Sequence, residues 1–441
     1  MNVQKNTETA ILFAGDILFW GIALWLTLFV RELSVPEARV VILHLRAFGF
    51  IFAVWAIVFF IADLYKSPTL IVRKNLPNII LRAQVANSII AVLFFYFIPY
   101  FGITPRTNLF IDLFISFILV SLWRIYLVNI LYGGDKSKVL LIGRGSEVDE
   151  LATEIEKNPR YRTSVRRMDV FALDDVSRAL STGEFSALIA DLRDAIPANG
   201  RHGLLELLFS KVKIIDVREL YEEIFDRVPL SLLSDGWFLE NIYSHPKRAY
   251  NFFKRSMDIV AASLLGLVTL PLYPLVAFFI KLDTRGPVFT LQTRIGQDGK
   301  CVTLYKFRTM TKNDMGKWGE KNDNKVTRIG AFLRRYRIDE PPQLWNVFRG
   351  DVSLIGPRPE FPEPVEIYKR EIPYYQVRHL IQPGLSGWAQ IYAEHPHHKI
   401  SIEETRNKLA HDLYYVKNRG LWLDLKIALK TVKILFSREG I

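Results

Sequence analysis

The sequence is poor in features that identify several classes of protein. It contains one cysteine, Cys301, so a disulfide within the chain is excluded and the cysteine indicates no particular chemistry. No cleavable secretory signal is evident, because Met1 to Thr9 is polar with only Lys5 basic, and no small-residue cleavage site follows the next apolar run. Acidic residues are also outnumbered, with 45 Asp and Glu against 57 Lys and Arg, which gives a formal charge of +12.

The basic excess is concentrated in the last part of the chain. Residues 254 to 441 hold 30 Lys and Arg against 19 Asp and Glu. This imbalance suggests polyanionic ligands or an anionic membrane surface. Cytoplasmic segments that obey the positive-inside rule would account for part of it. No nucleic-acid partner is expected.

Apolar residues are abundant, at 50% of the chain, and the mean hydropathy is +0.14, which predicts a membrane protein with two or three domains. Within residues 1 to 133, four apolar stretches are each close to the roughly 20 residues that cross a bilayer as a helix. The links that hold Lys66, Arg73 and Lys74, and then Lys136 and Lys138, favour a cytoplasmic N-terminus and a cytoplasmic chain after residue 133. The stretches are residues 10 to 30, 40 to 63, 77 to 101 and 108 to 132.

Residues 134 to 230 alternate between strand-like and helix-like segments, which predicts a small parallel α/β sheet. Gly143-Arg144-Gly145 is similar to a dinucleotide-binding loop, but Val148 occupies the third glycine position. We interpret this domain as a degenerate Rossmann-like module that packs or regulates, and a working nucleotide site as the weaker alternative. The expected strands are residues 139 to 142, 169 to 172, 187 to 190 and 212 to 216.

Residues 231 to 253 read as a linker, and an apolar run follows in the segment 254 to 282. Pro271 and Pro274 interrupt the run, and proline inside a helix removes a hydrogen bond and clashes with the preceding turn. Basic residues flank both ends of the run. We therefore favour a re-entrant helix that breaks at Pro271 and returns to the same membrane face, over a kinked full crossing.

The remaining segment, residues 283 to 441, has no further apolar run of 20 residues. Its last stretch, residues 421 to 436, places Lys426, Lys430 and Lys433 along one side of a helix. That pattern fits an interfacial helix in the lipid headgroups. An amphipathic helix packed on its own domain fits equally well.

The residues best suited to chemistry are the adjacent carboxylates Asp339 and Glu340, which follow an arginine cluster that includes Arg337. A carboxylate can serve as a covalent nucleophile, and phosphoryl transfer needs cations that neutralise phosphate oxygens. The segment supplies both, so we interpret it as a site for phosphoryl chemistry. The structural alternative is a pair at a helix start that interacts with the helix dipole and the neighbouring arginines.

Three further cations are candidates for binding substrate phosphates. Lys306 and Arg308 lie two apart in a strand-like segment and would point to one face, unless they are surface charges of an edge strand. Arg358 lies between two prolines, which restrict its backbone, and its guanidinium can bind phosphate in a bidentate fashion. The histidines at 395, 397 and 398 fit no strong metal-ligand spacing and are interpreted as loop residues.

The order of several motifs between residues 252 and 437 resembles the bacterial sugar transferases known as polyprenyl-phosphate glycosyl-1-phosphate transferases, monotopic type. The four apolar stretches and the Rossmann-like module in front resemble the long form of that family. One departure is visible, because the family usually has leucine after the acidic pair and this chain has Pro341. The motifs are Gly286-Pro287-Val288-Phe289, Gln292-Thr293-Arg294-Ile295-Gly296, Tyr305-Lys306-Phe307-Arg308-Thr309-Met310, Asp339-Glu340, Gly356-Pro357-Arg358-Pro359-Glu360 and Pro383-Gly384-Leu385-Ser386-Gly387-Trp388-Ala389-Gln390.

The resemblance implies a mainly helical α/β catalytic domain at the inner leaflet of a bacterial inner membrane, on the cytoplasmic side. It implies that Asp339 attacks a nucleoside diphosphate sugar, expected to be a UDP-sugar, and that polyprenyl (undecaprenyl) phosphate then accepts the sugar phosphate. Asp339 and Glu340 would hold Mg²⁺, and Asp412 would support the site. This is the first membrane step of exopolysaccharide, capsule, O-antigen or glycoprotein glycan synthesis, and long-form relatives suggest a homodimer.

Two alternatives remain open. A membrane-bound, NAD-dependent nucleotide-sugar dehydratase would need Tyr and Lys one helical turn apart, and its best candidates, Tyr243 and Lys247, have Pro246 between them. A non-catalytic membrane scaffold for polysaccharide assembly would retain its function after Asp339→Asn.

Overall fold

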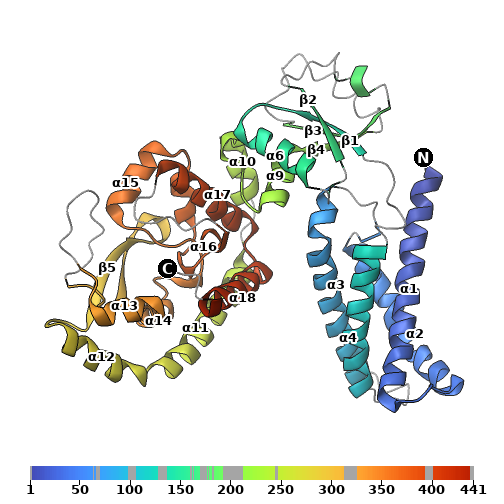
Figure 1. The fold of residues 1–441 in the computed structure, drawn as a ribbon, viewed down its shortest axis with the longest axis horizontal. Coiled ribbons are helices and arrows are strands. Elements are labelled where there is room, and N and C mark those ends of the chain that lie inside the picture. Colours follow the sequence, from blue (N-terminus) through green and yellow to red (C-terminus); the bar gives the residue numbers. More distant parts are fainter. Residues whose placement is uncertain are drawn as a thin grey trace. The chain divides into compact units, whose positions relative to one another are not determined.

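In a computed structural model the chain forms two compact units, residues 1 to 224 and residues 225 to 441 (Figure 1). The described residues are 2–62, 64–65, 70–97, 106–127, 137–158, 161, 163–168, 176, 178–180, 183–191, 212–243, 247–311, 325–392 and 401–437.

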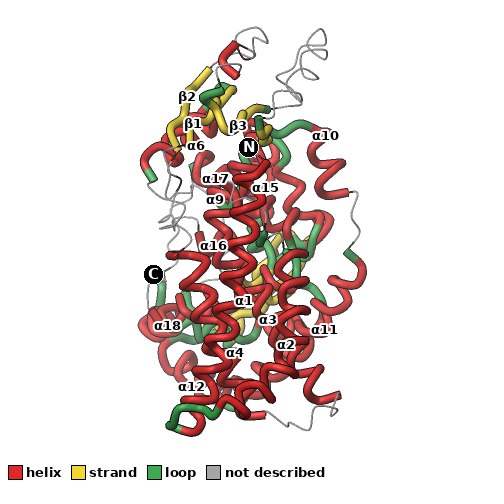
Figure 2. Tube along the Cα trace, turned by 90° about the vertical axis from the view of Figure 1, so that its right-hand side faces the viewer, coloured by secondary structure: helices red, strands yellow, loops and turns green. Residues whose placement is uncertain are grey.

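The first unit begins with four long helices that run alongside one another (Figures 1 and 2). Each contains 20 or more consecutive residues that are apolar enough to cross a membrane, as the sequence predicts. The last helix ends in a π-helical turn at Trp123–Leu127. The helices are α1 (Asn2–Glu32), α2 (Ala38–Ile61), α3 (Leu70–Phe97) and α4 (Arg106–Leu122).

The core of this bundle combines aromatic packing with a buried ion pair. Trp20 lies against Trp55 and Phe59, with ring centroids 5.6 and 5.3 Å away. The guanidinium of Arg124 donates to Asp16 and to the main-chain oxygen of Leu64. Charged groups in a membrane are costly unless they are paired, and here Arg124 and Asp16 pair with each other. The pair joins α1 to the end of α4.

A four-stranded parallel sheet in the order β2-β1-β3-β4 follows the bundle in sequence. The expected strands near residues 139, 187 and 212 are present, whereas the expected strand at 169 to 172 lies outside the described residues and β2 comes before it. Val148, at the position of the missing third glycine, is buried, and a Cβ on Gly143 would lie 3.3 Å from it. The elements are β1 (Ser137–Ile142), α6 (Ser146–Lys157), β2 (Thr163–Met168), β3 (Phe185–Ala190), β4 (Lys213–Asp216) and α9 (Val217–Phe225).

The second unit is mainly helical and carries one antiparallel hairpin, β5-β6, and one short parallel pair, β7-β8. Its helices are α10 (Asp235–Phe238), α11 (Arg248–Thr269), α12 (Leu272–Asp283), α13 (Arg328–Arg335), α14 (Gln343–Arg349), α15 (Pro362–Glu371), α16 (Trp388–Tyr392), α17 (Ile402–Asn418) and α18 (Leu421–Ser437). Its strands are β5 (Phe289–Ile295), β6 (Cys301–Phe307), β7 (Ser353–Ile355) and β8 (Gly384–Ser386).

The segment that we interpreted as a linker, residues 231 to 253, contributes to the core of this unit. It contains α10, and Trp237 is buried in one hydrophobic cluster with Val365 and Tyr368. It also contains the first residues of α11, which begins at Arg248. The sequence of this segment does not show how Trp237 packs, because Val365 and Tyr368 lie more than a hundred residues further along the chain.

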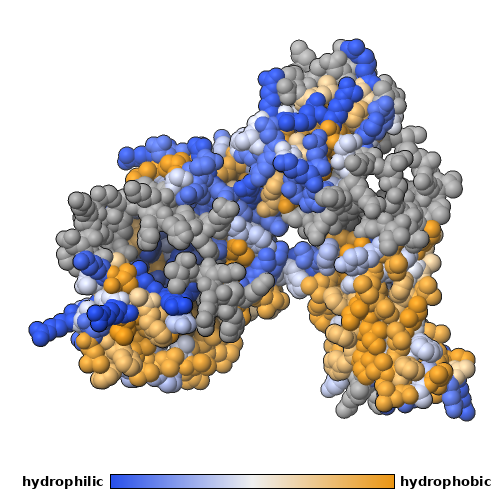
Figure 3. Space-filling model, in the orientation of Figure 1, coloured by the Kyte–Doolittle hydropathy of each residue, from blue (hydrophilic) through white to orange (hydrophobic). Residues whose placement is uncertain are grey.

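Helices α11 and α12 are bent by 59° at Leu270 and Pro271, where the sequence places the helix break. Both helices expose large apolar side chains, among them Leu264, Val268, Leu275 and Phe278. Figure 3 shows that hydrophobic residues gather on the edge of the unit that these helices form. An unpartnered apolar surface of this kind fits insertion into a membrane.

The last helix, α18, packs on its own domain and also presents apolar residues outward. Leu423 and Ile427 are buried, and the carboxylate of Asp424 accepts hydrogen bonds from Tyr250 and Tyr415. Other positions of the helix are exposed and apolar, namely Leu421, Leu425, Leu429 and Val432. Lys426 lies over the ring of Trp388, with its Nζ 4.7 Å from the ring centroid.

Candidate active site

The acidic pair lies in a tight turn between α13 and α14. Thr327 caps the start of α13 by accepting from the N–H of Gly330, and a Cβ on Gly330 would overlap the main-chain oxygen of Thr309 at 2.0 Å. After α13, Arg337 adopts a left-handed backbone with φ 51°. Pro341 and Pro342 come directly before α14, where a missing N–H costs no helical hydrogen bond.

The hairpin brings Lys306 to this turn. The N–H of Phe307, the last residue of β6, donates to the main-chain oxygen of Asp339 at 3.0 Å. Lys306 Nζ then lies 3.3 Å from Glu340 Oε1 and 4.0 Å from Asp339 Oδ2. Burial lowers the pKa of Lys306, although the nearby Glu340 opposes this shift.

Glu340 is held by three cations. Arg358 and Lys306 each lie 3.3 Å from Oε1, and Arg337 lies 3.7 Å from Oε2. Burial alone would raise the pKa of Glu340, but Arg358, Lys306 and Arg337 outweigh it and hold the pKa at about 2. Glu340 therefore stays ionised and fixes the three cations around the turn.

Asp339 is held much less firmly. It is 7% exposed, and within the described residues its one ion pair is the 4.0 Å contact with Lys306. Burial raises the pKa of Asp339, and the attraction of Lys306 only partly offsets this effect. A buried, loosely paired carboxylate beside fixed cations is well suited to attack an electrophile, because it gives up few contacts when it reacts.

The loop that carries Arg358 is fixed by a second group of charges. Arg378 Nε donates to the carboxylate of Asp412 at 2.9 Å, and its Nη2 donates to the main-chain oxygen of Arg358 at 2.9 Å. Glu360 accepts from Lys408 at 2.6 Å and from the hydroxyl of Tyr375 at 2.9 Å. Asp412, which we expected to support the site, thus contacts Arg378, which in turn holds the main chain of Arg358.

Close backbone contact also sets the position of this loop. β7 and β8 pair side by side, and a Cβ on Gly384 would lie 2.0 Å from the backbone nitrogen of Gly356. Only glycine fits at position 384, so the motif that contains it serves the geometry of the Arg358 loop.

Arg308 differs from the other cations proposed to bind phosphate. Its guanidinium donates to the main-chain oxygens of Thr284 and Arg285 and to the hydroxyl of Thr284, at 2.8 to 3.0 Å. β6 ends at Phe307, so Arg308 lies outside the strand. A spacing of two residues therefore does not direct its side chain to the same partner as that of Lys306. Lys306, Arg337, Asp339, Glu340 and Arg358 form one cluster, and the contacts of Arg308 hold the chain after α12.

Sequence reasoning did not single out Arg378, Lys408 or Tyr375. All three make contacts with residues distant in sequence, such as that of Arg378 with Asp412, 34 positions further along the chain. Their only signal in the sequence is that charged and aromatic side chains recur in a segment otherwise typical of a buried core.

The described residues contain no group of three or more metal-ligating side chains. A divalent ion here would be held by the adjacent carboxylates, chiefly by the loosely paired Asp339, together with oxygens of a bound phosphate. Mg²⁺ is commonly bound in this way, through one or two carboxylates and substrate phosphates. The histidines at 395, 397 and 398 lie outside the described residues.

The structure does not place Tyr243 and Lys247 as a nucleotide-sugar dehydratase would need them. Tyr243 ends one helical turn, whereas Lys247 caps the start of α11. Lys247 Nζ donates to the main-chain oxygens of Lys417 and Arg419. Tyr243 and Lys247 therefore do not share one helix.

One family model and several known proteins match parts of this sequence. The family model described as "Bacterial sugar transferase" matches residues 249–438. UDP-N-acetylgalactosamine-undecaprenyl-phosphate N-acetylgalactosaminephosphotransferase of Aeromonas hydrophila is 37% identical over 265 residues, which are 59% of this chain and 61% of the relative. Undecaprenyl-phosphate glucose phosphotransferase of Komagataeibacter xylinus is 33% identical over 69% of this chain and 60% of its own length.

The match to a third relative covers a larger share of that relative's own length. UDP-glucose:undecaprenyl-phosphate glucose-1-phosphate transferase of Caulobacter vibrioides is 40% identical over 198 residues, which are 44% of this chain and 74% of the relative. The family match at residues 249–438 contains Lys306, Arg337, Asp339, Glu340 and Arg358. The chain, which spans about three fifths of the first two relatives, belongs to the bacterial sugar transferase family of polyprenyl-phosphate glycosyl-1-phosphate transferases.

Proposed function

We propose that the protein transfers a sugar 1-phosphate from a UDP-sugar to polyprenyl (undecaprenyl) phosphate, in two steps through a phosphosugar intermediate on Asp339. The observation that carries the proposal is the contrast between the two carboxylates. Glu340 is held by three cations, whereas the buried neighbour Asp339 has one long ion pair at 4.0 Å.

In the first step an oxygen of Asp339 attacks the β-phosphorus of the UDP-sugar. A bond forms between that oxygen and phosphorus, the bond between the phosphorus and the bridging oxygen breaks, and UMP leaves with the bridging oxygen. Lys306, Arg337 and Arg358, within 3.7 Å of Glu340, would bind the oxygens of the diphosphate and reduce their repulsion of the attacking carboxylate.

In the second step a phosphate oxygen of the polyprenyl phosphate attacks the same phosphorus. The new bond completes the polyprenyl-diphosphate-sugar, and the bond to Asp339 breaks to regenerate the carboxylate. The acidic pair lies in sequence between exposed aromatic residues, Phe332 and Tyr336 before it and Trp345 and Phe348 after it. This placement fits a site at headgroup level, where a lipid phosphate can reach Asp339.

Mg²⁺ is part of the proposal. When bound, it would neutralise charge on the diphosphate, and Asp339 and Glu340 are the residues that would hold it. Arg358, fixed between two prolines and by Arg378, would orient the phosphate.

We place the protein in a bacterial inner membrane, with the second unit on the cytoplasmic side and α11-α12 as a re-entrant anchor. The 59° bend and the basic residues at both ends of the pair support this arrangement. We also propose that the sheet domain is a Rossmann-like module and that the protein forms a homodimer. The relatives' names give two different sugars, so the reaction is assigned as a class and the sugar is left to experiment.

Mass spectrometry of the purified protein after incubation with UDP-sugars and Mg²⁺, without lipid acceptor, tests the proposal. We expect a mass increase of one sugar phosphate on Asp339, and no increase in the Asp339→Asn variant. Glu340→Gln serves as the matched control, because it removes the neighbouring charge but leaves the nucleophile, so adduct formation should be slowed and not abolished.

Two results would contradict the mechanism in different ways. UMP release that requires polyprenyl phosphate and leaves no adduct would indicate direct transfer. No adduct and no turnover with any donor, together with full cellular function of Asp339→Asn, would support the scaffold alternative.

A further inference from the structure

A cavity of about 190 Å³ opens beside the first turns of α11, away from the acidic pair. Arg255 in its wall contacts the far end of α14, where it donates to the main-chain oxygens of Val347 and Phe348. The acidic pair precedes the other end of α14. Seven helical residues, roughly 10 Å at 1.5 Å per residue, separate the two places.

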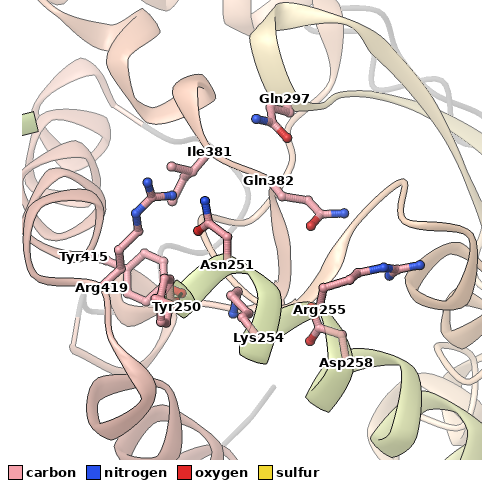
Figure 4. Close-up of a pocket in the computed structure, with 10 residues that line it drawn as sticks. All are labelled: Tyr250, Asn251, Lys254, Arg255, Asp258, Gln297, Ile381, Gln382, Tyr415 and Arg419. Atoms are coloured by element: carbon pink, nitrogen blue, oxygen red, sulfur yellow. Dashed lines mark hydrogen bonds between the residues drawn. The ribbon is translucent and has the colours of Figure 1, made fainter. Parts of the chain in front are cut away.

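The cavity is lined by Lys254, Arg255 and Arg419, and some of their N–H groups have no acceptor among the described residues. Lys254 lies 3.1 Å from Asp424 and still has two further N–H donors. The guanidinium of Arg419 and the side-chain amide of Asn251 make no hydrogen bond or ion pair within the described part of the chain. In Figure 4 both project into the same side of the cavity, near Ile381.

A free acceptor lies one turn further along α11. Asp258 is 4% exposed; its Oδ1 accepts from the N–H of Leu354, and its Oδ2 is buried with no hydrogen-bond partner. Helical side chains lean toward the N-terminus of the helix, so this oxygen lies close to the turn of Lys254 and Arg255. The cavity therefore offers donors for an anion and, one turn further along α11, a buried acceptor without a hydrogen-bond partner.

The surroundings favour a ligand with an apolar part. Phe252, Phe253 and Leu421, next to cavity residues in sequence, are exposed. Phe252 and Phe253 belong to α11, whose exposed apolar side chains continue to Val268. A second cavity of about 370 Å³ shares Ile381 and Arg419 with the first and is lined in part by Val377, Leu380 and Val416.

We propose that this cavity binds the phosphate diester of a membrane phospholipid whose headgroup can donate a hydrogen bond. Arg419, Asn251 and Lys254 bind the phosphate, and Asp258 Oδ2 accepts from a hydroxyl or ammonium group of the headgroup. Phosphatidylglycerol and phosphatidylethanolamine satisfy both conditions, whereas phosphatidylcholine has a phosphate and no donor. The site is separate from the acidic pair and does not depend on the transferase reaction.

Native mass spectrometry of the full-length protein, released from detergent micelles doped with equal amounts of phosphatidylglycerol and phosphatidylcholine, tests the proposal. We expect the wild type to retain phosphatidylglycerol in preference. Arg419→Gln should weaken that retention about 10-fold or more, since a charge-assisted hydrogen bond is lost. Asp258→Asn, which keeps an acceptor for Leu354 but replaces the free oxygen with a donor, should reduce the preference over phosphatidylcholine.

The controls separate this site from the active site. Arg370→Gln changes an exposed arginine on α15 and should retain lipid like the wild type. Asp339→Asn should also retain it, whether or not the variant transfers sugar phosphate. Equal retention of both lipids by the wild type and Arg419→Gln would overturn the proposal. So would Arg419-dependent thermal stabilisation by inorganic phosphate without any lipid preference, which would assign a soluble phosphate compound instead.

Discussion

At the scale of single residues, the two neighbouring carboxylates differ in how firmly they are held. Glu340 has a pKa of about 2 because Arg358, Lys306 and Arg337 outweigh its burial. Burial raises the pKa of Asp339 instead, and Lys306 opposes that rise. Two adjacent residues of similar chemistry therefore suit different tasks, one that organises cations and one that reacts.

This contrast predicts the pH dependence of the first step. A raised pKa means that Asp339 keeps its proton to higher pH, so the nucleophile is lost as pH falls through a value above the ordinary 3.8. Lys306→Met removes the main opposing charge, which should move this acid limb to higher pH and slow the reaction. The rate of UMP release in the absence of lipid acceptor, followed against pH, measures the shift.

Lys300→Met is the matched control for Lys306→Met, because it removes an exposed lysine from the turn of the same hairpin. Its acid limb should coincide with that of the wild type. An unchanged acid limb in Lys306→Met would mean that Asp339 does not limit the rate at low pH.

A second prediction concerns the buried charges behind Arg358. Arg378→Met leaves the carboxylate of Asp412, which is 1% exposed, without its partner at 2.7 Å. We expect the free energy of unfolding to fall by about 3–5 kcal/mol, as for other buried pairs that lose one member. Denaturant unfolding of the detergent-solubilised protein provides the measurement.

The double variant Arg378→Met, Asp412→Leu removes both charges and should recover part of that loss. If the double variant is as unstable as the sum of the single ones, the two side chains do not act as a pair. Slower transfer in a variant that remains folded would show that the group positions Arg358.

At the scale of elements, the parts of the site differ in how far the sequence predicts them. The turn with Asp339 and the proline-flanked Arg358 could be predicted, because a local motif fixes both the residue type and its presentation. Arg308 contacts Thr284 and Arg285 and not the partner of Lys306, because strand alternation ends where β6 ends, at Phe307. Arg378 could not be predicted, since its role exists only after η7 (Tyr375–Leu380) packs on α17.

The helix break at Pro271 yields a prediction about the membrane anchor. A reporter cysteine, Arg285→Cys, placed after α12 in a Cys301→Ser background, should be labelled by an impermeant maleimide only from the cytoplasmic side. Replacing both prolines, Pro271→Leu and Pro274→Leu, restores a continuous apolar helix with interior hydrogen bonds. That helix is long enough to cross, so part of the reporter should become accessible from the opposite side.

A cysteine at Arg248, Arg248→Cys, is the matched control and should stay on the cytoplasmic side in both backgrounds. Labelling of the Arg285→Cys reporter from the outside, with both prolines in place, would contradict the re-entrant arrangement and indicate a kinked crossing.

At the scale of the whole molecule, all residues of the proposed site and the apolar edge formed by α11 and α12 belong to the second unit, residues 225 to 441. The family match also falls within this unit, at residues 249–438. In the Caulobacter vibrioides relative, the matched region makes up 74% of the protein. The first unit supplies membrane helices and a parallel sheet and contains none of the residues of the proposed site.

We therefore expect a truncated protein of residues 225 to 441 to bind membranes and to form the sugar-phosphate adduct on Asp339. Adduct mass and membrane flotation measure the two properties independently. Flotation without an adduct would mean that the first unit is needed for catalysis, and an adduct without flotation would place the membrane anchor in α1 to α4. Both properties together would assign anchoring and chemistry to the second unit, because its buried charge clusters and its apolar edge are held by contacts among its own residues.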